Sequence, residues 1–217
     1  MFIKHEEGKT ELVYEVKVNI PPVGIVYDYV EKDWVKVPVF KNTNISKDQK
    51  WFRHIPAFDY DVEREMEKEK QKYDKLYFDP KLEGYRNEEW FKRLNGVWFM
   101  CKGVPTYITG LHYMYLNWWK IDIGYPHYRD SDRRTWLYWN WAVENPDSYG
   151  LIECTRRRSG KTARAALAAF DPPSRMMNVQ SGIQSKTRDD AKSFFTKVIG
   201  SFKYLPDFFQ PVYDYKK

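Results

Sequence analysis

Cysteine is scarce in this chain of 217 residues, which contains only two, Cys101 and Cys154. Both fall in segments that we expect to be strands, and they do not have the spacing of metal ligands, so a reducing compartment is favoured. No stretch approaches the roughly 18 consecutive apolar residues of a membrane-spanning helix. Residues 1–11 also lack the apolar centre of a secretory signal peptide. The sequence therefore predicts a soluble intracellular protein without a membrane partner.

Internal repeats and low-complexity segments are absent as well, and the distinctive features of the composition are basic charge and aromatic rings. The net charge is +6 and the isoelectric point is near 9.0, which suits an anionic partner without identifying it. Aromatic residues make up 18% of the chain, with 9 Trp and 17 Tyr. Most of these rings are expected in the core, because each buries a large area, and some have the chemistry to stack on nucleic-acid bases.

The segment from Gly150 to Phe170, GLIECTRRRSGKTARAALAAF, has the pattern of a strand, a basic turn and a helix of small residues. Residues 150–154 form a short apolar run that ends in a turn, which is typical of a strand buried in a parallel sheet. Residues 155–162 then match the spacing of a phosphate-binding loop, which ends in Gly-Lys-Thr. The alternative interpretation is a basic surface loop between a strand and a helix.

Each residue type in this loop has a chemical role in phosphate binding. Backbone N–H groups of the loop and the dipole of the following helix attract the β-phosphate. Lys161 is expected to reach the β- and γ-phosphates of ATP, and the Thr162 hydroxyl is expected to ligate Mg²⁺. Gly160 is needed because a Cβ there would crowd the phosphate and restrict the backbone. Thr155 stands where the first glycine of such a loop is usual. The predicted nucleotide-binding residues in the loop are Thr155, Arg156, Arg158, Ser159, Gly160, Lys161 and Thr162.

The elements after the loop indicate an α/β fold. Residues 171–173, Asp-Pro-Pro, are expected to end the first helix. A second strand over 177–184 leads into a helix that reaches about Phe202, with Thr187 and Asp190 as an approximate capping box. This order is the first β-loop-α-β-α part of a P-loop NTPase parallel sheet, incomplete within this chain. A mixed β/α N-terminal region precedes it.

We divide the chain into three regions: a β-rich N-terminal region (1–58), a helical and aromatic region (59–147) and the first part of a P-loop ATPase domain (148–217). The expected elements before the loop are strands over 11–20, 25–30 and 34–40, helices over 59–77, 87–94, 111–119 and 130–143, and a hairpin over 97–107.

His112 has no histidine or carboxylate partner at metal-ligand spacing, so a core or hydrogen-bonded role is expected for it and for the other histidines.

Three consecutive arginines, Arg156, Arg157 and Arg158, are unusual in a phosphate-binding loop. One interpretation is charge on a solvated turn. The other is positive charge supplied in cis to the γ-phosphate as it leaves, because a guanidinium stays charged and can bind two phosphate oxygens at once.

These segments resemble the large terminase subunit of tailed bacteriophages, the ATP-driven motor that packages double-stranded DNA into an empty procapsid. The phosphate loop of that family commonly lacks the first glycine and carries arginine, as this chain does. The resemblance extends from about Trp90 to the end of the chain. Its segments are TRRRSGKT, IQSKTRDDAKSFF, GVWFMCKGVPTYITGLHYMYLNWWKID and LPDFFQP.

The resemblance implies ATP and Mg²⁺ as cofactors and assigns roles by position. Lys161 and Thr162 would hold the phosphates and the metal, and Arg157 would be the catalytic arginine acting in cis. Arg129 and Asp130 lie in a segment, 128–133, that corresponds to the family's adenine-binding segment. The same residues also suit a helix N-terminus with capping carboxylates.

The resemblance further implies several partners. Residues 185–187, Ser-Lys-Thr, lie where related translocases contact the nucleic-acid backbone, although an ordinary strand-to-helix cap has the same pattern. Double-stranded DNA, the portal protein, the small terminase subunit and further copies in a ring would be the partners. The host cytoplasm, and transiently the portal vertex of the procapsid, would be the location.

Part of the family's pattern has no counterpart after the loop. A packaging ATPase also uses a strand that ends in Asp-Glu, which serves the metal and the attacking water, and it normally carries a separate nuclease domain. After Thr162 no apolar strand ends in this way, because Asp189 and Asp190 open a helix. We therefore expect an N-terminal fragment or one product of a split gene, inactive in hydrolysis by itself. A helicase-like motor and a non-catalytic nucleotide- or DNA-binding adaptor are the alternatives.

Overall fold

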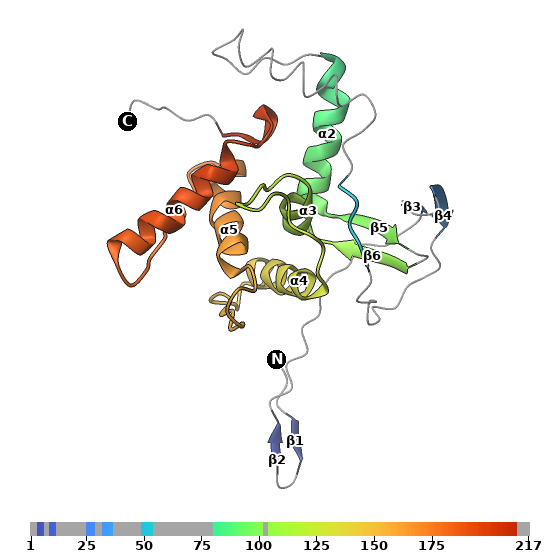
Figure 1. Ribbon diagram of the computed structural model, residues 1–217. Helices are drawn as coiled ribbons and strands as arrows, with labels where there is room; N and C mark the ends of the chain where they lie inside the picture. Colours follow the sequence, from blue (N-terminus) through green and yellow to red (C-terminus); the bar gives the residue numbers. More distant parts are fainter. Residues whose placement is uncertain are drawn as a thin grey trace.

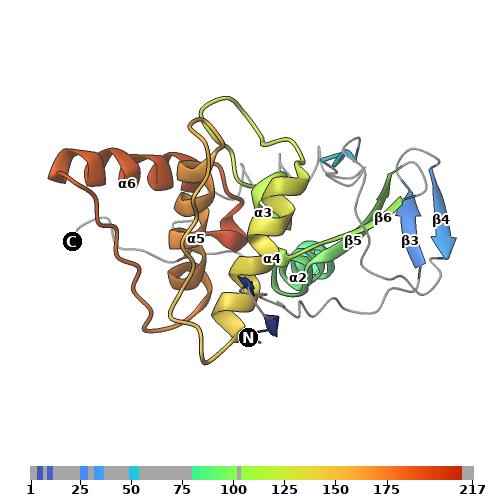
Figure 2. The same ribbon diagram turned by 90° about the horizontal axis from the view of Figure 1, so that it is seen from below.

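The computed structural model describes residues 4–6, 9–11, 25–28, 32–36, 49–53, 80–101 and 104–211. The predicted helix over 59–77 and most of the predicted strand over 11–20 lie outside these residues. Figure 1 shows the helices grouped on one side of a small sheet, and Figure 2 shows the same layers from below. None of the described helices has the length and apolar character needed to cross a bilayer.

A four-stranded sheet combines strands from the first two predicted regions, in the order β4-β3-β5-β6. Strands β5 (Val97–Cys101) and β6 (Val104–Ile108) form the antiparallel hairpin that the sequence predicts. Strand β3 pairs with β4 in antiparallel fashion and with β5 in parallel, where Asp28 faces Met100. The remaining strands are β3 (Ile25–Asp28), β4 (Asp33–Lys36) and a separate hairpin of β1 (Lys4–Glu6) and β2 (Lys9–Glu11).

Helix α2 (Pro80–Asn95) begins well before the predicted position at Asn87. Pro80 occupies its first position, where the fixed φ angle of proline suits a helix and its missing N–H is not needed. The predicted stop is confirmed, because Gly96 follows the helix with a φ angle of 76°. Asn87 is therefore an interior residue and the prediction that it caps the helix is wrong.

Helix α3 (Gly110–Asn117) is the buried central helix and contacts α2, α4 and α5. The Thr109 hydroxyl caps it by accepting a hydrogen bond from the His112 backbone N–H. A Cβ on Gly110 would lie only 1.8 Å from the Arg93 carbonyl oxygen, so glycine is what allows the end of α2 to approach this closely. The predicted buried helix over 111–119 is confirmed.

Helix α4 (Asp130–Glu144) agrees with the predicted helix over 130–143 and ends at Asn145 as expected. The predicted cap is wrong, since Arg129 occupies the N-cap position without a side-chain cap bond. The Asp130 carboxylate instead accepts hydrogen bonds from Arg133 and Arg134 on the same helix.

Helix α5 (Lys161–Arg175) continues through Pro172 and Pro173, so the predicted break at these residues is wrong. An interior proline removes a helical hydrogen bond and normally ends the helix. Here Asp171 anchors the turn, because its carboxylate accepts from Arg93 of α2 at 3.0 Å and from Arg175 at 2.6 Å. A buried tertiary ion pair thus outweighs the local preference.

Helix α6 (Arg188–Phe202) ends where the sequence predicts. The Thr187 hydroxyl caps it by accepting from the Asp190 backbone N–H, which confirms half of the predicted capping box. The Asp190 carboxylate accepts from the Thr187 hydroxyl and so does not complete the box. A short helix, η1 (Asp207–Phe209), follows and packs on α2 through Trp90 and Phe209.

Residues 150–154 and 177–184 are irregular rather than strands, and the prediction that 150–154 is a buried strand is wrong. Ile152 is 91% exposed and Met177 is 89% exposed. A strand of a parallel sheet is held by hydrogen bonds to neighbouring strands, and neither segment has such a neighbour in the described part of the chain. Figure 2 shows both segments as coils beside α5.

Aromatic rings fill the core, as the composition predicts. Phe99, Tyr115, Trp119, Trp136 and Phe209 are the largest fully buried aromatic side chains, and they come from the hairpin and from the chain that follows it. The core also includes residues of α5 and α6, so one hydrophobic cluster joins the region before the loop to the region after it.

His112 lies in this core, where its ring stacks on that of Tyr128. Neither ring nitrogen has a hydrogen-bond partner among the described residues. Burial, and then the charges of Arg133 and Arg164, lower the pKa of His112 to about 3. The predicted core role is confirmed for His112, whereas His127 is exposed.

This burial predicts acid sensitivity. Between pH 6.5 and about 3 the unfolded chain binds a proton at His112 that the folded chain does not bind, so stability should fall as the pH decreases. The contribution to the slope is at most about 1.4 kcal/mol per pH unit. The His112→Phe variant keeps a ring on Tyr128 without the titration. Its free energy of unfolding, measured with urea, should decrease less steeply in the upper part of this interval. The matched control, His127→Phe, should keep the wild-type slope, and equal slopes for all three proteins would refute the prediction.

Candidate functional site

The candidate phosphate-binding loop, residues 155–160, lies between the irregular segment 150–154 and the first turn of α5. Two of its residues have left-handed backbones, Arg158 with φ 63° and Gly160 with φ 85°. Gly160 is the N-cap of α5, and its carbonyl accepts from the N–H groups of Ala163 and Arg164. The loop therefore ends at a helix N-terminus, whose unpaired N–H groups and dipole favour an anion.

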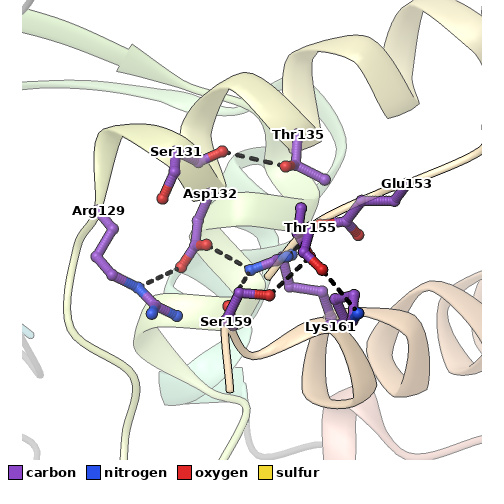
Figure 3. Close-up of polar contacts among 9 residues, drawn as sticks. Arg129, Ser131, Asp132, Thr135, Glu153, Thr155, Ser159 and Lys161 are labelled. Atoms are coloured by element: carbon purple, nitrogen blue, oxygen red, sulfur yellow. Dashed lines mark hydrogen bonds and ion pairs between the residues drawn. The ribbon is translucent and has the colours of Figure 1, made fainter. Parts of the chain in front are cut away.

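Lys161 lies across the loop. Its Nζ donates a hydrogen bond to the backbone carbonyl of Thr155 at 3.0 Å. The hydroxyls of Thr155 and Ser159 are hydrogen bonded to each other at 2.7 Å (Figure 3). These two contacts close the loop into a ring. Thr155, which stands where a glycine is usual, thus contributes both its carbonyl and its side chain to the shape of the loop.

Arg164 fixes the loop to the rest of the molecule, a role that the sequence analysis missed. Its side chain is buried, and Nη1 donates to the Ser159 carbonyl at 2.8 Å and to Asp132 at 2.5 Å. Its Nη2 donates to Glu153 in the segment before the loop. The signals in the sequence were a single arginine among the alanines of a predicted packing helix and a single glutamate in an apolar run.

The predicted adenine-binding residues, Arg129 and Asp130, have different partners in the structure. Arg129 lies next to the loop, and its Nη2 is 2.9 Å from the position that a Cβ on Gly160 would occupy. Its Nε donates to Asp132 at 3.0 Å. Asp130 is engaged with Arg133 and Arg134 on its own helix.

Arg156, Arg157 and Arg158 are exposed, and none has a hydrogen bond or ion pair with another residue of the described chain. Their charges are therefore not neutralised by a close carboxylate among those residues. Together with Lys161, which is also exposed, they give the loop a strongly positive surface.

Thr162, the predicted metal ligand, is exposed on the first turn of α5 and lines an open cavity of about 790 Å³. The cavity lies between α5 and α6, and residues 181–185 form another part of its wall. Asp190 is the acidic residue of this lining. In the described part of the chain no three His, Cys, Asp or Glu side chains form a metal-binding group.

Comparisons with protein families, with curated proteins and with solved structures give no match to this chain. The proposal for its function therefore depends on the geometry of the loop and on the resemblance of the short segments described above.

The contacts of Arg164 predict a large effect on stability. Arg164→Met removes the charge but keeps a long apolar side chain, and it leaves Asp132 and the Ser159 carbonyl without this donor. The free energy of unfolding in urea should decrease by about 3–5 kcal/mol, as for other broken buried ion pairs. The control is Arg134→Met, because the Arg134 side chain is 62% exposed, and its effect should be within about 1 kcal/mol. If both substitutions have the same small effect, Arg164 does not hold the loop in place.

Proposed function

We propose that residues 155–162 bind the triphosphate of ATP with Mg²⁺, and that the chain is the ATPase part of a large terminase subunit that packages double-stranded DNA. The observation that carries the proposal is the position of Lys161. Its Nζ crosses the loop to the Thr155 carbonyl while Gly160, in a left-handed conformation, opens α5. A phosphate over this ring would be within reach of the lysine and of the backbone N–H groups at the helix N-terminus.

The residues of the loop fit a polyphosphate in space and in charge. Gly160 carries no side chain on the face where Arg129 approaches. Lys161 and the three loop arginines are exposed, and each bond from them to a phosphate oxygen would be charge-assisted. Because Lys161 is bonded to one carbonyl only, it can bind phosphate without breaking a buried ion pair.

Thr162 and Asp190 suit a magnesium ion that is held mainly by the nucleotide. Both residues line the same cavity beside the loop. Mg²⁺ bound with a nucleotide usually takes one or two protein oxygens, together with phosphate oxygens and water. Bound there, the ion would neutralise charge on the phosphates, and Thr162 would supply its hydroxyl as a ligand.

Arg157 is the proposed catalytic arginine. Hydrolysis of ATP spreads negative charge over the oxygens of the transferred γ-phosphoryl group, and a nearby guanidinium stabilises that charge. Arg157 is exposed and has no ion pair with the other described residues, so its side chain can turn toward the phosphate. Lys161 would remain on the β- and γ-phosphates throughout.

The DNA-packaging part of the proposal is supported by the resemblance and by exposed charge. Ser185, Lys186 and Thr187 are exposed just before α6, where a duplex backbone would have access to them. Binding of this kind has no sequence preference and weakens steeply with salt. The portal protein, the small terminase subunit and other copies in a ring are the partners we propose, and the host cytoplasm and the portal vertex are the proposed location.

ATP binding and ATP hydrolysis by this chain, with and without double-stranded DNA, test the proposal directly. Turnover stimulated by DNA would support the motor. Binding without turnover is expected both of an incomplete ATPase part and of the non-catalytic adaptor, and turnover that appears when a segment with the Asp-Glu strand is added would favour the motor. If ATP does not bind, the assignment of the loop is wrong.

Lys161→Ala should abolish ATP binding in isothermal titration, because it removes the cation on the β- and γ-phosphates. The far-ultraviolet circular dichroism spectrum should not change, since Lys161 is exposed. Lys192→Ala, an exposed lysine of α6 away from the loop, is the matched control and should keep wild-type affinity. An unchanged ATP affinity in Lys161→Ala would count against the whole assignment.

Arg157→Ala should bind ATP with nearly wild-type affinity and, in a protein that also contains the Asp-Glu strand needed for hydrolysis, lose DNA-stimulated turnover. Removal of an arginine finger lowers turnover by roughly 10³- to 10⁵-fold. Steady-state phosphate release is the measurement, and Arg134→Ala on α4 is the control with full turnover. Turnover that survives in Arg157→Ala would mean that another residue stabilises the transition state.

A further inference from the structure

The carboxylate of Asp132 lies between two arginines beside the loop. Its side chain is 1% exposed; one oxygen accepts from Arg129 Nε at 3.0 Å and the other accepts from Arg164 Nη1 at 2.5 Å (Figure 3). Burial raises the pKa of Asp132, whereas both arginines act in the opposite direction. A buried carboxylate between two guanidinium groups gives each of them a defined position.

The two arginines differ in how many of their N–H groups are already hydrogen bonded within the protein. Arg164 is buried, and its terminal nitrogens are bonded to Asp132, Glu153 and the Ser159 carbonyl. The Arg129 side chain is 45% exposed, is held to Asp132 through Nε, and also interacts with the Tyr115 hydroxyl. Its terminal nitrogens carry no bond to the carboxylates drawn in Figure 3, so the N–H groups that Tyr115 does not occupy can donate to a ligand.

One terminal nitrogen of Arg129, Nη2, lies at the end of the phosphate-binding loop. Nη2 lies 2.9 Å from the position of a Cβ on Gly160, the residue that directly precedes Lys161. A guanidinium held along one edge presents its remaining N–H groups in a fixed plane, and this geometry suits two oxygens of a phosphate.

We propose that Arg129 binds a phosphate of the nucleotide rather than its base, and that Asp132 is the positioning residue that holds Arg129 for this contact. The inference rests on the proposed nucleotide binding by the loop. It changes the role that the resemblance implies for the segment 128–133. Asp130 takes no part, because its carboxylate is bonded to Arg133 and Arg134.

Inorganic tripolyphosphate separates the two roles of Arg129, because it has the phosphates of ATP without the base. Isothermal titration of wild type and Arg129→Ala with each ligand is the experiment. Loss of a charge-assisted bond to phosphate should weaken both ligands by the same factor, about 10- to 100-fold. Arg134→Ala, at an exposed arginine of α4 five residues further along the chain, is the control that should bind as wild type does.

Asp132→Asn tests the positioning role. It should weaken both ligands, and the double variant Arg129→Ala/Asp132→Asn should bind no more weakly than Arg129→Ala, because Arg164 keeps its bonds to Glu153 and the Ser159 carbonyl and Asp132 then acts on binding through Arg129. Arg129→Lys, which keeps the charge without the planar fork, should recover part of the affinity. Arg129 is partly exposed, so its variants should fold even if Asp132→Asn is destabilised.

The outcomes distinguish this inference from the proposed function. If Arg129→Ala weakens ATP but leaves tripolyphosphate unchanged, Arg129 contacts the base and the inference is overturned. If both ligands bind Arg129→Ala as they bind wild type, while Lys161→Ala abolishes binding, only this inference fails. If wild type binds neither ligand, the proposed function fails and the inference fails with it.

Discussion

The buried guanidinium of Arg164 is the interaction on which the candidate site depends. A buried cation is tolerated only when anions and carbonyl oxygens surround it. Here they come from three parts of the chain: Asp132 of α4, Glu153 before the loop and the carbonyl of Ser159 within it. Any movement of the loop relative to α4 would separate the Arg164 guanidinium from one of these partners and leave a buried charge without a hydrogen bond. The loop therefore has one defined position even though it lies on the surface.

A second buried pair, Arg93 with Asp171, holds the opposite end of α5. The helix is thus attached at its first turn to α4 and near its last turn to α2. The aromatic core between them supplies the apolar burial that drives folding, but rings alone tolerate sliding and repacking more readily than directional bonds do. The two ion pairs determine where along the core α5 lies, and so where the N–H groups of its first turn are directed. The exposed arginines of the loop remain available for a ligand.

Local patterns in the sequence were sufficient for much of the fold. The hairpin of β5 and β6, the buried helix α3, the extent of α4 and α6 and the stop at Gly96 all follow from apolar periodicity, capping residues and turn residues that act within a few positions. The failures have a common cause. Helix α5 passes through Pro172 because a distant arginine anchors Asp171, and residues 150–154 are not a strand because a strand requires neighbours that sequence proximity does not provide.

For the candidate site, the sequence by itself determined the chemistry of the loop. The loop is defined by adjacent positions: the order Gly160, Lys161 and Thr162, the arginines before them and the small residues after them. Each of these features acts on residues a few positions away in the sequence. Only the tertiary structure decided that Arg129 lies beside Gly160 and that Asp132 joins it to Arg164. Arg129 and Asp132 lie at the start of α4, whereas Gly160 and Arg164 lie at the start of α5. Their contact depends on the packing of α4 against the core and on the cost of burying charge, which local sequence patterns do not encode.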